Sequence, residues 1–187
     1  SIDPATGQPV GRFAAGGERE AKDAIAAARR AFDYSDWAHN PRARQLVLLA
    51  WAAKLQSHSD EIANLLTREN GKILRQAEGE VAAAISEIRY EAGLARAVRG
   101  SAQEVEPVVF ATVYREAAGV TAIIVPWNGP VLLLIRSLAP ALAAGCTAIV
   151  KPAPQTALVT AKVMEDLVSI AELPRGVVNL VMETGHA

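Results

Sequence analysis

Residues 120–152 read VTAIIVPWNGPVLLLIRSLAPALAAGCTAIVKP, and this stretch decides the fold. Its first six residues form a continuous apolar run, which is typical of a strand buried on both faces. A helical run follows at 130–143, where Pro140 is expected to bend or end the helix, and a second strand follows at 147–150. The alternation continues with a predicted helix at 156–170 and a predicted strand at 177–181. This β-α-β-α-β order predicts an α/β fold, with a Rossmann-like parallel sheet that helices cover on both faces.

The chain before this stretch predicts helices and then a ribbon. Apolar residues recur at spacings of three and four, the period of helices with one buried face. Buried stripes are expected at Ala21, Ile25, Ala28 and Phe32, at Leu46, Leu49 and Ala53, and at Val81, Ile85, Ile88, Ala92 and Ala95. After Pro107, a β-branched and aromatic run predicts an edge strand or a protruding ribbon. We therefore divide the chain into an N-terminal helical part at 1–100, a ribbon at 101–115 and the first half of a Rossmann-like sheet at 116–187.

The composition argues against several classes of protein. The 187 residues carry a formal net charge of −1, so no basic surface favours nucleic acid or an acidic membrane. No apolar run reaches the length of a membrane span, and no signal segment opens the chain. One cysteine excludes an internal disulfide and indicates a reducing setting, and three isolated histidines leave no metal cluster. We therefore expect a cytoplasmic globular protein with no metal, nucleic acid or membrane partner.

Three short segments follow the predicted strands, at 126–129, 151–154 and 182–185. Ligands of open parallel sheets bind beyond the carboxyl ends of the strands, so these segments should line one crevice. An aromatic ring, a side-chain amide and the cation of Lys151 would converge there. The amino ends of the following helices would add main-chain donors for a phosphate. The pattern indicates a nucleotide site, although no G-x-G-x-x-G or Walker fingerprint follows any strand.

The motifs at these positions resemble those of the aldehyde dehydrogenase superfamily. The likeness rests on VPWNGP at 125–130, APALAAG at 139–145, KP at 151–152 and LPRGVVN at 173–179, and upstream on DPATG at 3–7, ENGK at 69–72 and EV at 80–81. The resemblance implies NAD(P)-dependent oxidation of an aldehyde to a carboxylic acid. In that chemistry a cysteine thiolate attacks the aldehyde, hydride passes to the nicotinamide, and water hydrolyses the resulting thioester.

The resemblance also implies roles for individual residues. Asn128 corresponds to the amide that donates a hydrogen bond to the oxyanion of the tetrahedral intermediate, although Asn128-Gly129 taken alone would predict only a turn. Lys151 resembles the lysine that contacts the adenosine ribose of the cofactor. The other expected cofactor-binding residues are Ile124, Val125, Pro126, Trp127, Ala153 and Pro154. Many family members carry glutamate where Pro154 stands, and Glu183 replaces a common glycine, so both NAD and NADP remain open as the cofactor.

The one cysteine is expected to be structural. Cys146 precedes the second strand, where a free cysteine commonly packs as a small apolar residue, and the nucleophile of the family lies far downstream. The chain starts without methionine and stops at Ala187 just after a predicted strand, so we expect a fragment that would be inactive alone. The resemblance implies a homodimer or homotetramer joined through the 101–115 ribbon. Two alternatives stay open, a CoA-acylating relative and a non-catalytic nucleotide-binding or assembly module.

Overall fold

The computed structural model describes residues 1–184. In chain order the elements are α1 (Glu18–Tyr34), the 3-10 turn η1 (Trp37–His39), α2 (Pro41–Ser57), α3 (Ser59–Asn70), α4 (Leu74–Leu94), β1 (Ser101–Glu106), β2 (Val109–Val113), β3 (Val120–Val125), α5 (Pro130–Ala143), β4 (Thr147–Pro152), η2 (Pro154–Thr156), α6 (Ala157–Val168) and β5 (Val178–Leu180). The predicted β-α-β-α-β order and the α/β fold are confirmed. None of these helices is long and apolar enough to cross a bilayer.

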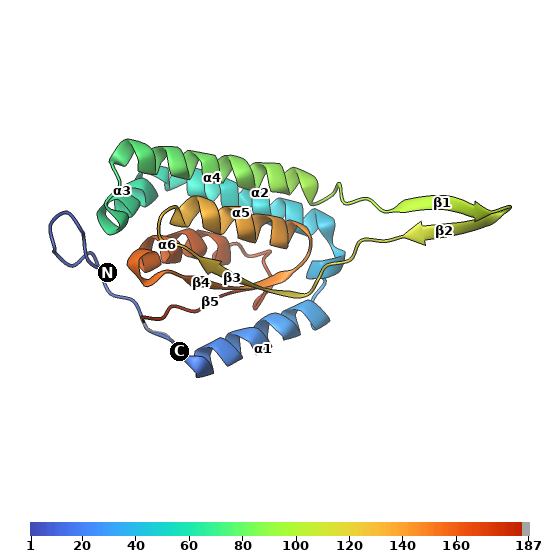
Figure 1. Cartoon of the computed structure of the whole chain (residues 1–187), viewed down its shortest axis with the longest axis horizontal. Helices are drawn as coiled ribbons and strands as arrows, with labels where there is room; N and C mark the ends of the chain where they lie inside the picture. Colours follow the sequence, from blue (N-terminus) through green and yellow to red (C-terminus); the bar gives the residue numbers. More distant parts are fainter. Residues whose placement is uncertain (185–187) are drawn as a thin grey trace.

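The parallel sheet has the strand order β3-β4-β5. Helix α1 lies against one face of it, α5 and α6 lie against the other, and α2, α3 and α4 form a further layer over α5 and α6 (Figure 1). Strand β3 is at the edge of this sheet, and the side chain of Ile124 on it is 76% exposed. Helices thus lie against both faces of the sheet, as predicted, but at the β3 edge α1 leaves Ile124 uncovered. An open apolar strand face results.

Pro140 does not end its helix, so the second of the two expected effects is wrong. It lies inside α5, which continues to Ala143. A proline at this position removes the hydrogen bond from its own N–H to the residue four positions earlier, and its ring crowds that carbonyl, so other contacts must keep the turn helical. Leu138 and Leu142 on either side of it are fully buried. Their packing keeps this last turn helical.

The helical part has the predicted period; the buried face of α2 was predicted in the wrong phase, and that of α1 was predicted correctly only in part. The predicted stripe is confirmed at all five positions, at Val81, Ile85, Ile88 and Ala92 in α4 and at Ala95 directly after it. In α1 the predicted Ala28 is buried, together with Ala24 and Ala31, which were not predicted, whereas the predicted Ile25 is 52% exposed. In α2 they include Val47, Leu48, Trp51 and Leu55, and Leu46 and Leu49 are exposed. Both helices carry apolar residues on adjacent faces, so periodicity alone could not tell which face meets the core.

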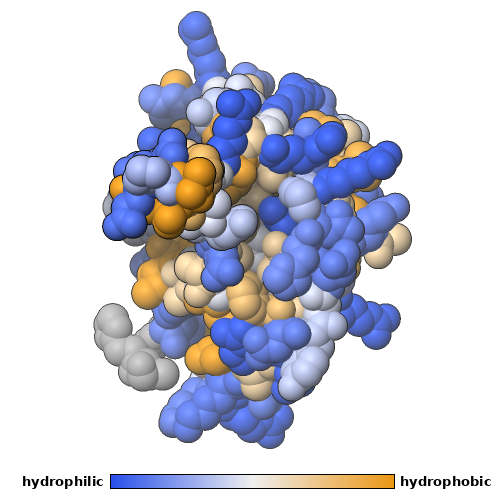
Figure 2. All heavy atoms as spheres, turned by 90° about the vertical axis from the view of Figure 1, so that its right-hand side faces the viewer, coloured by the Kyte–Doolittle hydropathy of each residue, from blue (hydrophilic) through white to orange (hydrophobic). Residues whose placement is uncertain are grey.

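Strands β1 and β2 form an antiparallel hairpin that projects from the body of the molecule (Figure 1). Every residue of both strands is exposed. The large apolar residues of the ribbon that meet solvent are Val105, Val108, Val109, Phe110, Val113 and Tyr114. Figure 2 looks at the molecule from the side on which the ribbon projects and shows apolar atoms among hydrophilic ones. The predicted protruding ribbon is confirmed, and an isolated two-stranded hairpin of this kind is marginally stable in water without a partner surface.

Candidate functional site

The predicted crevice lies where the carboxyl ends of the three parallel strands meet. The register places Ile124 beside Lys151, and the amide of Ala153 donates to the carbonyl of Val125 at 3.0 Å. A cavity of about 460 Å³ is lined there by Trp127, Pro154 and Thr184, together with residues of the N-terminal segment and of the end of α3. Gly185, the last residue of the third predicted segment, lies outside the described residues. The first two segments and the described part of the third therefore border one site.

The Trp127-Asn128 turn is fixed through its main chain. The Asn70 side chain donates from Nδ2 to the carbonyl oxygen of Trp127 at 2.6 Å. The Lys72 ammonium donates to the carbonyl oxygen of Asn128 at 3.2 Å. The Asn128 side chain is exposed, and within residues 1–184 it forms no hydrogen bond. The turn is thus held in place while the Asn128 amide remains available to a ligand.

A buried ion pair supports this turn from α4. The side chains of Lys72 and Glu80 are paired and only 13% and 9% exposed. Glu80 also accepts hydrogen bonds at Oε1 from the amides of Val131 (2.8 Å) and Leu132 (3.2 Å) in the first turn of α5. Glu80 therefore joins α4, the Trp127-Asn128 turn and the start of α5 in one network.

A second glutamate holds the start of α6. Glu69, at the end of α3, is 3% exposed and accepts from the amides of Leu158 at 2.9 Å and Val159 at 2.7 Å. The amino ends of α5 and α6 were predicted to donate to a phosphate, and that prediction is wrong for these two helices. Carboxylates of the chain itself already take these amides, since a negative charge is stabilised at the positive end of a helix. Sequence reasoning found no role for either glutamate, and the only signal was their place in the ENGK and EV motifs.

The other predicted cofactor residues differ in what they offer. Trp127 is 57% exposed at the crevice, and Pro126 is exposed as well. Val125 is 2% exposed, so its side chain belongs to the core and only its main chain can meet a ligand. Ala153 and Pro154 are half-buried. Lys151 forms an ion pair with Glu183, with 3.1 Å between Nζ and Oε1.

Cys146 lies at the other end of the sheet. It is 6% exposed, and its carbonyl accepts a hydrogen bond from the indole of Trp37 at 3.0 Å. It precedes the six-residue strand β4, whereas Asn128 follows β3, so the length of a strand, roughly 20 Å, separates them. A thiol in that position cannot share a reacting carbon with Asn128.

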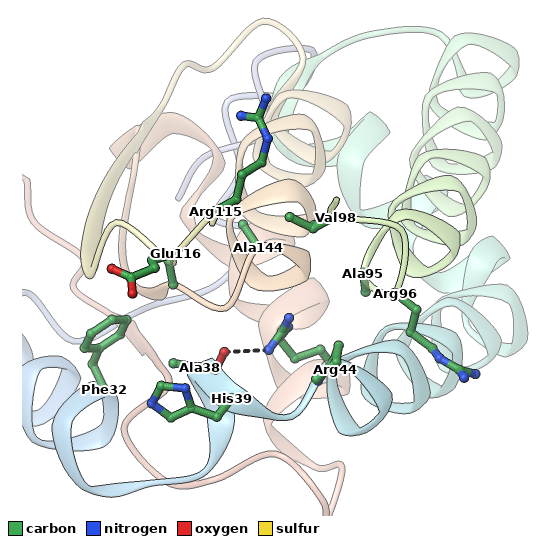
Figure 3. A pocket seen from close by; sticks show the side chains of 12 residues that line it. Phe32, Ala38, His39, Arg44, Ala95, Arg96, Val98, Arg115, Glu116 and Ala144 are labelled. Carbon is green, nitrogen blue, oxygen red and sulfur yellow. Dashed lines mark hydrogen bonds between the residues drawn. The ribbon is translucent and has the colours of Figure 1, made fainter. Parts of the chain in front are cut away.

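A second cavity, of about 420 Å³, lies near the amino ends of β3 and β4 (Figure 3). The Arg44 guanidinium in it donates to the carbonyl oxygens of Trp37, Ala38 and Ala143, each at 2.9 Å. Burial lowers the pKa of Arg44, and the nearby Cys146 opposes this effect. The side chains of Arg96 and Arg115 point away from Arg44 (Figure 3). Because these cations do not converge on a common point, the cavity lacks the organisation of the crevice.

Comparisons with known proteins agree with this geometry. The sequence model of the aldehyde dehydrogenase family matches residues 1–187. The chain is 38% identical over 188 residues to the aminoacetaldehyde dehydrogenase of Pseudomonas aeruginosa, covering 100% of this chain and 38% of that protein. It is 36% identical to the NADP/NAD-dependent aldehyde dehydrogenase PuuC of Escherichia coli, again covering 100% and 38%.

Solved structures give the same result. The betaine aldehyde dehydrogenase of Staphylococcus aureus, crystallised with NAD⁺, superposes with a TM-score of 0.94 at 32% identity, covering 98% of this chain and 37% of that one. PnpE in complex with nicotinamide adenine dinucleotide superposes with a TM-score of 0.93 at 35% identity, covering 99% and 38%. The chain thus spans about 38% of the length of the curated relatives that it matches. A match over all 187 residues and a shared fold show that the chain belongs to the aldehyde dehydrogenase family.

Proposed function

We propose that this chain is the front part of an NAD(P)-dependent aldehyde dehydrogenase, in which it supplies part of the cofactor crevice and the oxyanion-stabilising Asn128. One observation carries the proposal. The Asn128 amide is free within residues 1–184, while Asn70 and Lys72 fix the main chain of its turn. A donor held in this way needs no rearrangement when negative charge develops beside it.

The residues of the crevice fit a bound dinucleotide. Trp127 and Ile124 present exposed apolar surface, and Lys151 lies near the carboxyl end of the neighbouring strand β4. When bound, NAD(P)⁺ supplies the acceptor for the hydride of the aldehyde. The thiolate nucleophile would come from outside the described residues, since Cys146 is buried at the far end of the sheet. Asn128 would donate to the oxygen that becomes negative when that thiolate attacks the carbonyl carbon, an effect of about 3–4 kcal/mol on the barrier.

We further propose that the β1-β2 ribbon joins subunits in a homodimer or homotetramer. The support is its exposed apolar residues and its two free edges, which can pair with another strand. The open edge of β3 supports a continuation of the sheet by a further strand, because the order β3-β4-β5 leaves that side without a neighbour in residues 1–184. The Trp127-Asn128 turn would then lie at the point where strand order reverses, the usual ligand position in such sheets.

The test uses the protein as its gene encodes it. A panel of aldehydes is assayed with NAD⁺ or NADP⁺, with and without CoA, by absorbance of the reduced cofactor. Asn128→Ala is expected to lower kcat by roughly 10²–10³-fold with unchanged cofactor affinity. Asn64→Ala, which removes an exposed amide from α3, is the matched control. Near-normal turnover in Asn128→Ala would refute the oxyanion role, and CoA-dependent turnover would indicate the acylating alternative. Cofactor binding without oxidation of any aldehyde would favour a non-catalytic module.

A further inference from the structure

Lys151, which resembles the lysine that contacts the adenosine ribose in the family, forms an ion pair with Glu183 at the crevice. Lys151 is the last residue but one of β4, and Glu183 lies shortly after the end of β5. Both groups therefore come from the carboxyl ends of neighbouring parallel strands. Their side chains are 35% and 17% exposed, with 3.1 Å between Nζ and Oε1. The pair is accessible to a ligand but is not a fully solvated surface pair.

The main chain fixes the approach of Glu183. The amide of Val181 donates to the carbonyl of Val150 at 2.9 Å, which extends the pairing of β5 with β4. The amide of Gly16 donates to the carbonyl of Met182 at 2.5 Å. The two residues before Glu183 are thus tied to the sheet and to the N-terminal segment. The position of the carboxylate follows from these bonds as well as from its attraction to Lys151.

The pair changes the charge that the crevice presents. Lys151 alone would offer an uncompensated cation, which suits the 2′-phosphate of NADP⁺. With Glu183 beside it, the two groups together carry no net charge and include a hydrogen-bond acceptor. Carboxylates that bind the ribose 2′-hydroxyl favour NAD⁺, and a nearby cation is what accommodates a 2′-phosphate. Pro154, which lines the cavity together with Thr184, has no side-chain acceptor for a ribose hydroxyl.

We propose that Glu183 is the specificity-determining carboxylate of this site, accepting a hydrogen bond from the adenosine ribose and repelling a 2′-phosphate. The inference rests on the proposed cofactor function. Glu183 would thus bind the ribose hydroxyl, which the side chain of Pro154 cannot do. The site would then be selective for NAD⁺.

The test measures the equilibrium binding of NAD⁺ and of NADP⁺ to the protein as its gene encodes it. Binding is detected by calorimetry and by tryptophan fluorescence. The unmodified protein should bind NAD⁺ at least about tenfold more tightly than NADP⁺. The ratio of the two affinities is the measure of specificity. Glu183→Gln should reduce that ratio by roughly tenfold, mainly through tighter NADP⁺ binding. Glu172→Gln removes the same charge at the amino side of β5, where the residue is exposed, and should leave the ratio unchanged. Adding Pro154→Glu to Glu183→Gln should restore the preference for NAD⁺.

The outcomes separate the two proposals. Binding of neither cofactor by the unmodified protein would overturn the proposed cofactor function and this inference with it. Binding of both with similar affinity, or an unchanged ratio in Glu183→Gln, would overturn the inference alone. A thermal melt of each variant identifies any loss of folding. The double variant tests the role of the carboxylate independently, because it returns a carboxylate to the site at position 154.

Discussion

Replacing Glu69 by alanine should destabilise the fold far more than its place at the end of a surface helix suggests. The carboxylate is 3% exposed and accepts from two amides in the first turn of α6, at 2.9 Å and 2.7 Å. A hydrogen bond to a charged group contributes about 1.5–3 kcal/mol, and amides left without an acceptor add a desolvation cost. We expect Glu69→Ala to lower the free energy of unfolding by about 3–5 kcal/mol. In a domain of this size, that loss lowers Tm by roughly 6–20 °C.

The assay is urea unfolding followed by circular dichroism, together with a thermal melt. An unchanged m-value with a lower midpoint would show that stability itself has changed. Glu61→Ala is a matched control, because Glu61 also lies on α3 and also reaches α6, through Lys162 at 3.4 Å. That carboxylate is 59% exposed, so its loss should cost less than about 1 kcal/mol. Glu69→Gln keeps one acceptor oxygen and should give an intermediate loss. Equal losses in Glu69→Ala and Glu61→Ala would refute the capping role.

Three further predictions concern other parts of the chain. Burial, with repulsion from Glu87, raises the pKa of Glu91. The contribution of Glu91 to the stability of the fold is therefore present below the ordinary glutamate pKa and is lost as pH rises through the raised value. Glu91→Gln should therefore melt at a higher temperature than the unmodified protein at pH 7, and this advantage should shrink toward pH 4; melts across that range check it, and a constant difference would contradict it. Cys146→Ala should cost less than about 2 kcal/mol and leave aldehyde oxidation intact, because the thiol is a small buried group; an inactive but folded variant would make the cysteine functional. Replacing Val109 and Phe110 in the ribbon by lysine should leave the melting temperature of the monomer unchanged and shift light-scattering mass toward the monomer, and an unaltered oligomer would exclude the ribbon as the contact.

The strand–helix–strand core could be predicted from sequence because its signal is local. Strand β3 and helix α5 begin and end where residues 120–125 and 130–143 were predicted. A continuous apolar run of this length favours a strand, although one face of β3 is open at Ile124, and Gly129-Pro130 marks the start of the next element. The Trp127-Asn128 turn was therefore placed at the correct edge of the sheet before any contact was known. The buried faces of α1 and α2 were not, since several apolar faces satisfy the same period.

The contacts that organise the site could not be predicted from local pattern. Glu69 meets amides about ninety positions later in the chain, and Glu80 meets the start of α5 about fifty positions later. Glutamate is most often a solvated residue on a helix, and apart from their place in the ENGK and EV motifs nothing in the neighbouring sequence distinguishes these two from the exposed ones. The Lys151–Glu183 pair is a similar case, because each residue alone predicts only a charge at the end of a strand.

The two capping glutamates also account for the missing glycine fingerprint. In an ordinary dinucleotide-binding fold, glycines let the backbone approach the pyrophosphate at the amino end of the first helix. Here the amino ends of α5 and α6 already hold the carboxylates of Glu80 and Glu69, and a phosphate placed there would meet negative charge instead of free amides. Glycines for close approach would serve no purpose at these turns, and Pro130 can occupy the first position of α5. The surfaces left for a cofactor in residues 1–184 include the exposed Ile124 and Trp127 and the Lys151–Glu183 pair near the carboxyl ends of β4 and β5. Under the proposed function, the pyrophosphate would then have to be bound by groups other than these two helix ends, and the usual glycine motif would not be needed at either turn.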